Sequence, residues 1–230
     1  MIGTAGHQDG RKTFRLKKFQ DNFIFSEAKF PAMVSGWATG KTMCLIARAM
    51  LHSDKYPGNL GVIFRKEFTD LRDSTIRDFE SYTGLKVDSS RNCRLPNGSG
   101  IMFRHMEEIC NLQNINLGWF GIEQAEELDS DEQFFVLFGR LRRSGFPHWG
   151  AVIANTRGHN WIWNLWKMKN LEKSELIEAV TLDNAENLPS DFMDTLDIVR
   201  RHKPKRYANY VLNSWDEVVG QFFGEWDRKL

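Results

Sequence analysis

Residues 34 to 50 read VSGWATGKTMCLIARAM, and this segment decides the fold. A short apolar run leads into it, and apolar residues at helical spacing follow from Lys41, which predicts a strand, a loop and a helix in that order. Such a loop binds phosphate when its backbone N–H groups curl around the anion, a lysine reaches the outer phosphates and a hydroxyl holds Mg²⁺. Gly40, Lys41 and Thr42 match the glycine, lysine and hydroxyl of this pattern.

The loop departs from the usual phosphate-binding pattern at two positions. Ser35 stands where the first glycine is usual, although Gly36 beside it leaves the chain free to turn. Trp37 lies inside the loop, where its ring could stack on a neighbour or point outward. The alternative is a plain turn that binds nothing. We predict a nucleotide site, with ATP as ligand, built from Ser35, Gly36, Trp37, Ala38, Thr39, Gly40, Lys41 and Thr42.

A later apolar segment, LGWFGIE, ends at the carboxylate Glu123. A magnesium ion that bridges the outer phosphates needs a carboxylate opposite the loop hydroxyl, so Thr42 and Glu123 are the predicted Mg²⁺ ligands. Gln124 follows where a water-polarising glutamate is usual, and glutamine can orient a water but accepts a proton poorly. Either hydrolysis is slow, or Glu126 or Glu127 takes this role. The two glutamates could equally be favourable charges at a helix N-terminus.

The remaining sequence alternates apolar runs with helical patterns. This alternation predicts an α/β fold of the P-loop NTPase type (ASCE, RecA-like), with a mostly parallel central β-sheet flanked by helices. The predicted strands are 31–36, 59–66, 117–123, 148–156 and 175–183, the predicted helices are 41–51, 67–84 and 131–142, and a hairpin turns at PNGSG. Two more helices, about 189–202 and 205–213, form a small helical lid. We place the ATPase core at 1–185, the lid and linker subdomain at 186–215, and the start of a further linker at 216–230.

Composition narrows the possible functions. The chain has 230 residues, with 31 Lys and Arg against 30 Asp and Glu, so it is no polybasic nucleic-acid binder and any DNA contact must come from local patches. Its three cysteines show no spacing typical of a metal site and are expected to be reduced thiols. No stretch approaches the roughly 18 consecutive apolar residues of a membrane span, so no membrane partner is expected.

Four segments together resemble the ATPase domain of the large terminase subunit, the motor that packages DNA into the capsids of tailed phages and herpesviruses. They are SGWATGKT, VIFRKEFTDLRDST, LQNINLGWFGIEQAEEL and GRLRRSGFPHWGAVIANTRGHNWIW, and they span most of residues 14–166 in the expected order. The segment KRYANYVLNSWDEVVGQFFGEWD resembles the part that joins the ATPase and nuclease domains of that family.

The resemblance implies roles for individual residues. Lys41 and Thr42 would bind phosphates and Mg²⁺, and Glu123 would support the metal. Asn155 would sense the γ-phosphate, although an asparagine that caps a loop is the alternative. Gln20 falls where the family often has a glutamine that reads adenine, and a solvated helix residue is the alternative.

Two arginines of the family are missing. One is replaced by Trp37, and the other, shortly before Glu123, falls near Gln113. Arginine stabilises charge on a transferring phosphoryl group, so another residue would have to supply that cation. Candidate arginine fingers are Arg104, Arg140, Arg142 and Arg143, although the sequence favours the alternative that they are charges on a solvated helix end or strand edge. A basic group could contact DNA phosphates or simply end a helix: Arg200, Arg201, Lys203, Lys205 and Arg206.

The function implied by the resemblance is an ATP hydrolase that uses Mg·ATP to move double-stranded DNA into a procapsid. Its partners would be a portal protein and a small terminase subunit, in a homo-oligomeric ring when active or as a monomer in isolation. It would act in the cytoplasm of the infected host cell, docked transiently on the procapsid. The family's nuclease acids would lie beyond Leu230, so no nuclease activity is expected. The alternatives are a small P-loop nucleotide kinase and a non-catalytic nucleotide-binding scaffold.

Overall fold

The computed structural model describes residues 15–216, apart from the side chains at positions 109, 110 and 113. Seven strands form one sheet in the order β3-β4-β2-β5-β6-β1-β7. The hairpin pair β3–β4 is antiparallel, and the other neighbouring pairs are parallel, which confirms the predicted α/β architecture. The strands are β1 (Phe30–Ser35), β2 (Leu60–Arg65), β3 (Asn92–Arg94), β4 (Gly100–His105), β5 (Trp119–Ile122), β6 (Trp149–Ala154) and β7 (Ser174–Ala179).

Helices alternate with these strands. They are α1 (Lys18–Ile24), α2 (Lys41–Lys55), α3 (Phe68–Asp70), α4 (Arg77–Thr83), α5 (Glu132–Phe138), α6 (Ser190–His202) and α7 (Pro204–Tyr210). Other helical segments are 3-10 (Met106–Asn114, Ala125–Glu127, Thr181–Asn187) or π-helical (Leu71–Ile76, Trp163–Lys167). The predicted helix 67–84 is therefore interrupted by a π-helical segment, and the predicted helix 131–142 ends early, at Phe138. The sequence patterns did not predict α1 or the 3-10 segment before β5.

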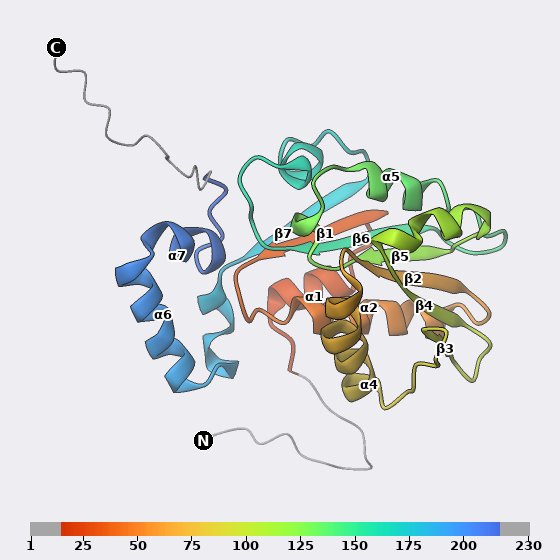
Figure 1. Cartoon of the computed structure of the whole chain (residues 1–230), viewed down its shortest axis with the longest axis horizontal. Coiled ribbons are helices and arrows are strands. Elements are labelled where there is room, and N and C mark those ends of the chain that lie inside the picture. Colours follow the sequence, from red (N-terminus) through yellow and green to blue (C-terminus); the bar gives the residue numbers. More distant parts are fainter. Residues whose placement is uncertain (1–14, 217–230) are drawn as a thin grey trace.

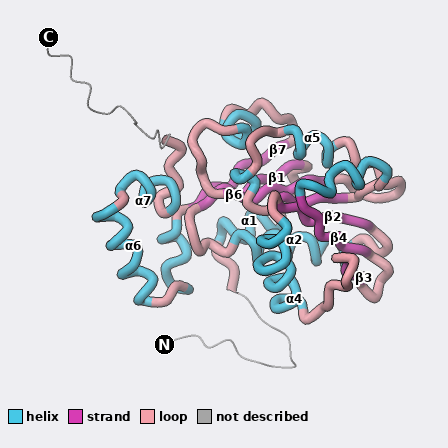
Figure 2. The backbone as a smooth tube through the Cα atoms, viewed as in Figure 1, coloured by secondary structure: helices cyan, strands magenta, loops and turns pink. Residues whose placement is uncertain are grey.

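The hydrophobic core forms a layer on each face of the sheet. Alternate residues of β1 point to opposite faces, Val34 to one and Met33 to the other. Helices α1, α2 and α4 pack on the face of Met33, whereas α5 and the Trp161–Lys167 region pack on the face of Val34. Figure 1 and Figure 2 show this arrangement, with helices above and below the central strands.

Two large aromatic side chains pack β5 against β6 on the face of the sheet that α2 covers. The rings of Trp119 and Trp149 stack with their centroids 5.0 Å apart and an interplanar angle of 1°. Room for them comes from Gly61 on β2, where a Cβ atom would lie 1.8 Å from the Trp119 ring. Because both tryptophans are buried, this packing fixes the register of the two strands that Glu123 and Asn155 directly follow.

Helices α6 and α7 contact each other and lie to one side of the layered body (Figure 1). The chain then returns to the sheet through residues 209–213, which we call the return segment. Asn213 Nδ2 donates to Val34 O at 3.0 Å, and Thr156 Oγ1 donates to Asn209 O at 2.8 Å. The return segment is thus hydrogen-bonded to β1 and to the loop after β6, while the boundary at 185/186 stays a prediction.

The composition predicted reduced cysteines and no membrane-spanning stretch, and two features of the structure bear on these expectations. Cys44 and Cys93 are free and buried, and the side chain of Cys110 lies outside the described part. None of the helices within residues 15–216 has the length and apolar character needed to cross a bilayer.

Candidate functional site

The carboxyl ends of four parallel strands meet at one edge of the sheet. Ser35 ends β1, Arg65 ends β2, Glu123 follows β5 and Asn155 follows β6. The loop after β1 runs directly into α2, whose N-terminus carries a partial positive charge and free N–H groups. The topology therefore brings together residues that are distant in sequence.

Side-chain hydroxyls and a left-handed glycine hold the loop in its turn. Ser35 Oγ and Thr39 Oγ1 share a hydrogen bond of 2.7 Å, and Thr39 Oγ1 also donates to Gly36 O at 3.0 Å. Gly40 has φ +82°, a conformation that favours glycine, immediately before α2. Gln20 is buried and its Nε2 donates to Thr39 O at 2.8 Å, so the solvated alternative for this residue is wrong.

Lys41 folds back into the loop that precedes it. Its Nζ donates to Ser35 O at 3.0 Å, to Gly36 O at 2.8 Å and to Asn155 Oδ1 at 2.9 Å. Burial lowers the pKa of Lys41 to about 8, although the Glu126 carboxylate acts in the opposite direction. The ammonium group thus lies inside the loop, where a phosphate would need a cation.

A loop hydroxyl and the strand-end carboxylate lie in direct contact. Thr42 Oγ1 donates to Glu123 Oε1 at 2.5 Å, and Thr75, from the π-helical segment, donates to Glu123 Oε2. Hydroxyl and carboxylate oxygens are the hard ligands that Mg²⁺ prefers, so this pair fits the metal. Within residues 15–216 no group of three or more His, Cys, Asp or Glu side chains could hold a metal. Phosphate oxygens and waters would therefore have to complete the coordination.

Arg65 engages the turn after Glu123. Its Nη2 donates to Gln124 Oε1, and it forms ion pairs of 3.7 Å with Glu127 and with Asp70. Arg65 is only 6% exposed, whereas the side chains of its acidic partners Asp70 and Glu127 are partly exposed to solvent. The carbonyl oxygen with which Gln124 could orient a water is consequently occupied.

Glu126 is the buried carboxyl group of the site. Its Oε1 accepts from Asn155 Nδ2 at 2.6 Å, and its Oε2 is buried with no hydrogen-bond partner among the described residues. Burial raises the pKa of Glu126. Asn155 therefore links Glu126 to Lys41 through the two ends of one amide. A buried carboxyl with a raised pKa and an unpartnered oxygen has the properties of a general base.

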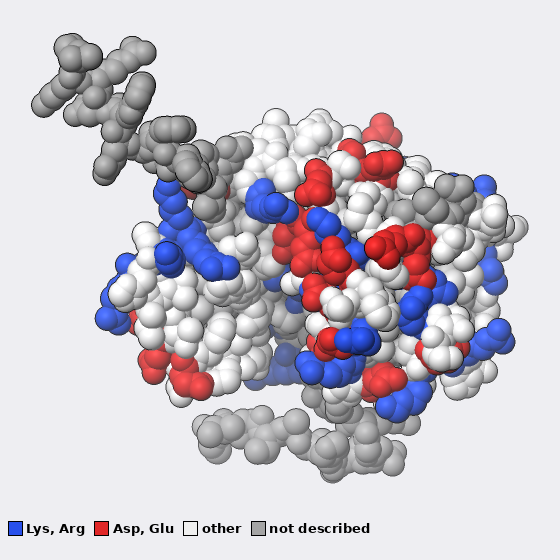
Figure 3. All heavy atoms as spheres, in the orientation of Figure 1, with Lys and Arg blue, Asp and Glu red and all other residues white. Residues whose placement is uncertain are grey.

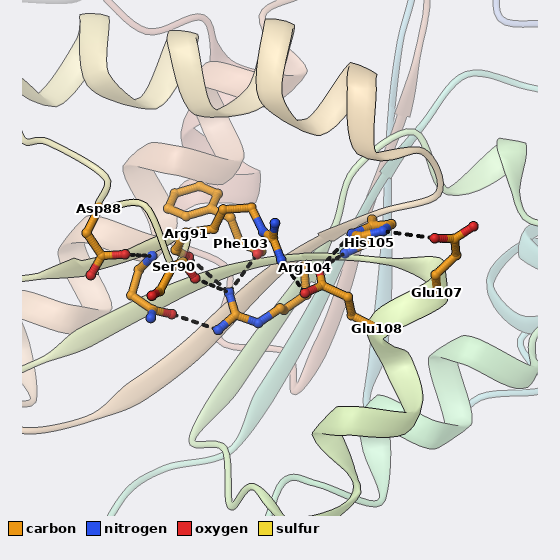
Figure 4. A network of polar contacts seen from close by, with 9 residues as sticks. Asp88, Ser90, Arg91, Phe103, Arg104, His105, Glu107 and Glu108 are labelled. Atoms are coloured by element: carbon orange, nitrogen blue, oxygen red, sulfur yellow. Dashed lines mark hydrogen bonds and ion pairs between the residues drawn. The ribbon is translucent and has the colours of Figure 1, made fainter.

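The candidate arginine fingers lie away from the loop of their own chain. Arg104 bonds to Arg91 O, Phe103 O and Asn92 Oδ1 in the network around β3 and β4 that Figure 4 shows. Arg143 donates to Gly58 O before β2, at the opposite edge of the sheet. The other two lie near the start of β5: Arg140 O accepts from Leu117 N, and Arg142 donates to Asn116 Oδ1. The side chain of Gln113 lies outside the described part.

Trp37 points outward, against α7 and the return segment. Its ring stacks on Tyr210, with centroids 4.9 Å apart and an interplanar angle of 21°. The backbone N–H of Trp37 donates to Tyr210 O at 2.6 Å, and the backbone carbonyl oxygen of Trp37 accepts from Thr181 Oγ1 at 2.9 Å. Asn184 Nδ2 donates to Ala38 O at 2.7 Å. The outer side of the loop is thus covered by segments from the C-terminal part of the chain.

Sequence reasoning missed Arg65, Thr75 and Tyr210. Arg65 ends an apolar strand at the same edge of the sheet as Glu123, and this position in the sequence could have predicted that Arg65 belongs to the site. Thr75 and Tyr210 belong to helical segments with no local feature that points to the site. Their roles arise only from the tertiary arrangement.

Comparisons with known proteins agree with this arrangement. The family model described as phage terminase large subunit matches residues 27–213. No curated protein matches the chain.

Solved structures show the same fold. The large terminase of a thermophilic bacteriophage, in complex with ATP-γ-S, has a TM-score of 0.72 at 15% identity and covers 88% of this chain and 53% of its own. The ATPase domain of the Thermus phage P74-26 large terminase has a TM-score of 0.67 at 14% identity, covering 88% and 94%. The HK97 bacteriophage large terminase has a TM-score of 0.64 at 11% identity, covering 88% and 51%.

The chain spans about half the length of the first and third of these proteins and nearly all of the P74-26 ATPase domain. The family match covers most of the chain, including the phosphate loop and the strand-end carboxylate. The chain therefore belongs to the phage terminase large subunit family.

Proposed function

We propose that this chain is an ATPase domain that binds Mg·ATP at the carboxyl edge of its sheet and hydrolyses it. The observation that carries the proposal is the 2.5 Å contact between Thr42 Oγ1 and Glu123 Oε1, two groups that a nucleotide-bound Mg²⁺ needs together. When bound, Mg²⁺ would neutralise charge on the outer phosphates. The ATP-γ-S found in the thermophilic bacteriophage protein supports the choice of nucleotide.

Each side chain then has one task. Lys41 exchanges its carbonyl partners for phosphate oxygens and neutralises their charge. Glu126 accepts a proton from the attacking water through its unpartnered Oε2, while the water oxygen bonds to the γ-phosphorus and the bond from that phosphorus to the β-phosphate oxygen breaks. The Asn155 amide donates to Glu126 and accepts from Lys41, so it couples the positions of these two side chains. Gln124 has its Oε1 engaged by Arg65, and Glu127 is paired with the same arginine, so Glu126 is the preferred base.

The setting of this activity is also proposed. Residues 1–185 would form the ATPase core and 186–215 a lid, within a ring that moves double-stranded DNA into a procapsid in the host cytoplasm. A portal protein and a small terminase subunit would be its partners. Figure 3 shows Lys and Arg side chains over α6 and α7, which offers phosphate-binding groups on the lid. An arginine finger would come from a neighbouring subunit, with Arg104, Arg140, Arg142 and Arg143 still the candidates.

Steady-state ATP turnover tests the proposal, measured with Mg²⁺ and with or without duplex DNA. Wild type should hydrolyse ATP, Lys41→Ala should lose nucleotide binding and turnover, and Glu126→Gln should bind ATP without turnover. Binding without turnover in wild type, even at high protein concentration with DNA, would instead favour the nucleotide-binding scaffold, to which the engaged Gln124 also points. Failure of wild type to bind any nucleotide would remove the proposal.

A further inference from the structure

The phosphate site has few cations of its own. Lys41 Nζ already donates to two loop carbonyls and to Asn155 Oδ1. Arg65 is occupied by Gln124 and by two acidic side chains. A nucleoside triphosphate adds several negative charges to this edge of the sheet, so a second cation near the loop would stabilise its binding.

Two backbone N–H groups of the loop bond elsewhere in the protein and are not available to a phosphate. Gly36 N donates to Ala179 O at 3.0 Å and Trp37 N donates to Tyr210 O at 2.6 Å, so both N–H groups point away from the cradle. Phosphates held in the loop must rely on the remaining amides and on side chains. This increases the importance of any positively charged group at the rim.

One positively charged group lies beside the loop, on α7. The guanidinium carbon of Arg206 lies 6.0 Å from the ring centroid of Trp37 and 5.7 Å from that of Tyr210. Stacking on two aromatic rings holds a guanidinium group in place without using its N–H donors. The residue is exposed, and its side chain forms no ion pair with another residue of the described range.

We propose that Arg206 binds the terminal phosphate of the nucleotide held by its own chain, and that the stack on Trp37 and Tyr210 positions it. This inference rests on the proposed function. Trp37 then acts as a platform for a cation that a different segment delivers to the loop. The arrangement also makes the position of α7 sensitive to the γ-phosphate, because Arg206 gains a partner in ATP that ADP lacks.

Affinities for ATP-γ-S and ADP, measured by isothermal titration calorimetry on the full chain, test this role. Arg206→Ala should weaken ATP-γ-S binding by about tenfold or more and leave ADP binding within about twofold, because charge-assisted contacts with one phosphate are lost. Arg206→Lys should lie between, since it keeps the charge but not the planar fork. The matched control is Arg201→Ala, which removes the same charge from exposed α6 and should change neither affinity.

The outcomes separate the two proposals. Equal weakening of ATP-γ-S and ADP by Arg206→Ala would show a merely structural stack and overturn the inference, as would no change in either. Arg157, in the loop after β6, donates to Glu126 O at 2.9 Å and is the other cation near the site. A selective loss with Arg157→Ala in place of Arg206→Ala would assign the phosphate-binding cation to that loop instead. In all three cases wild type still binds nucleotide and the proposed function stands, whereas wild type that binds neither nucleotide would remove both proposals.

Discussion

The tightest steric constraint on the phosphate loop lies at Gly36, and its replacement by alanine tests the described packing. A Cβ atom at this position would lie 2.5 Å from Thr181 Oγ1, 2.8 Å from Thr181 N and 2.9 Å from Val211 O. Two of these atoms are backbone and are joined to each other, because Thr181 N donates to Val211 O at 2.9 Å. The added methyl group therefore cannot be accommodated by rotating one side chain.

The expected cost follows from these contacts. Overpacking a tight site costs about 1–3 kcal/mol, and separating the Thr181–Val211 pair adds about 1 kcal/mol for a lost hydrogen bond. Gly36→Ala should therefore lower the free energy of unfolding by about 2–4 kcal/mol. It should also weaken ATP-γ-S binding, because the loop must shift to relieve the clash.

Urea denaturation followed by tryptophan fluorescence measures the first effect, and calorimetry the second. Gly139→Ala is the matched control: Gly139 has φ −64°, and a Cβ atom there would lie 3.5 Å from its nearest neighbours. That variant should be unchanged or more stable by about 0.4–1 kcal/mol. If Gly36→Ala unfolded within about 0.5 kcal/mol of wild type, where ordinary surface substitutions fall, the described approach of Thr181 and Val211 to the loop would be refuted.

Three further predictions concern the polar groups. Thr75→Val should lower the free energy of unfolding by about 1.5–3 kcal/mol, because the charged carboxylate of Glu123 loses the hydrogen bond that the Thr75 hydroxyl donates. An unchanged urea midpoint would contradict this contact. Glu126→Gln should reduce kcat by a factor of about 10²–10⁴ while ATP-γ-S still binds, and Gln124→Ala should have a smaller effect. The reverse order in a turnover assay would rule out Glu126 as the base and give Gln124 the task of orienting the water. Burial lowers the pKa of Lys41 to about 8 in the free protein, whereas a bound phosphate favours the charged form. Binding should therefore take up a proton near and above pH 8, and affinity should fall as pH rises further. Calorimetry in two buffers of different ionisation enthalpy measures this uptake, and a flat profile from about pH 7 to 9.5 would exclude it.

The sequence was sufficient to predict most elements because their signals are local. The buried strands β1, β2 and β6 are nearly continuous apolar runs, and α2 carries its apolar residues at helical spacing. Helix α1 was missed because polar residues separate its few buried side chains. The π-helical interruption before α4 leaves the apolar pattern almost unchanged, so it is not visible in the sequence.

Some residues of the candidate site could likewise be predicted from local sequence, whereas others could not. Lys41, Thr42 and Glu123 follow from a motif with fixed local spacing, and the structure brings them together. The partners of Gln124 and Trp37 come from β2 and α7, and no local rule states which distant strand end or helix will lie beside them. Sequence reasoning could list four arginines as possible fingers, but only the fold shows that Arg104 serves the β3–β4 network of its own chain.

Side chains of the phosphate loop have hydrogen-bond partners within the protein, and this affects how a ligand leaves. Lys41 has two loop carbonyls and Asn155 as partners, and Thr42 has Glu123. A departing product would therefore be replaced by protein acceptors already within reach, so release becomes an exchange of partners and no buried cation is left unsolvated. Under the proposed ATPase function, such a site would be ready for a new nucleotide as soon as the product has left, because the protein groups that replace the product are already in place.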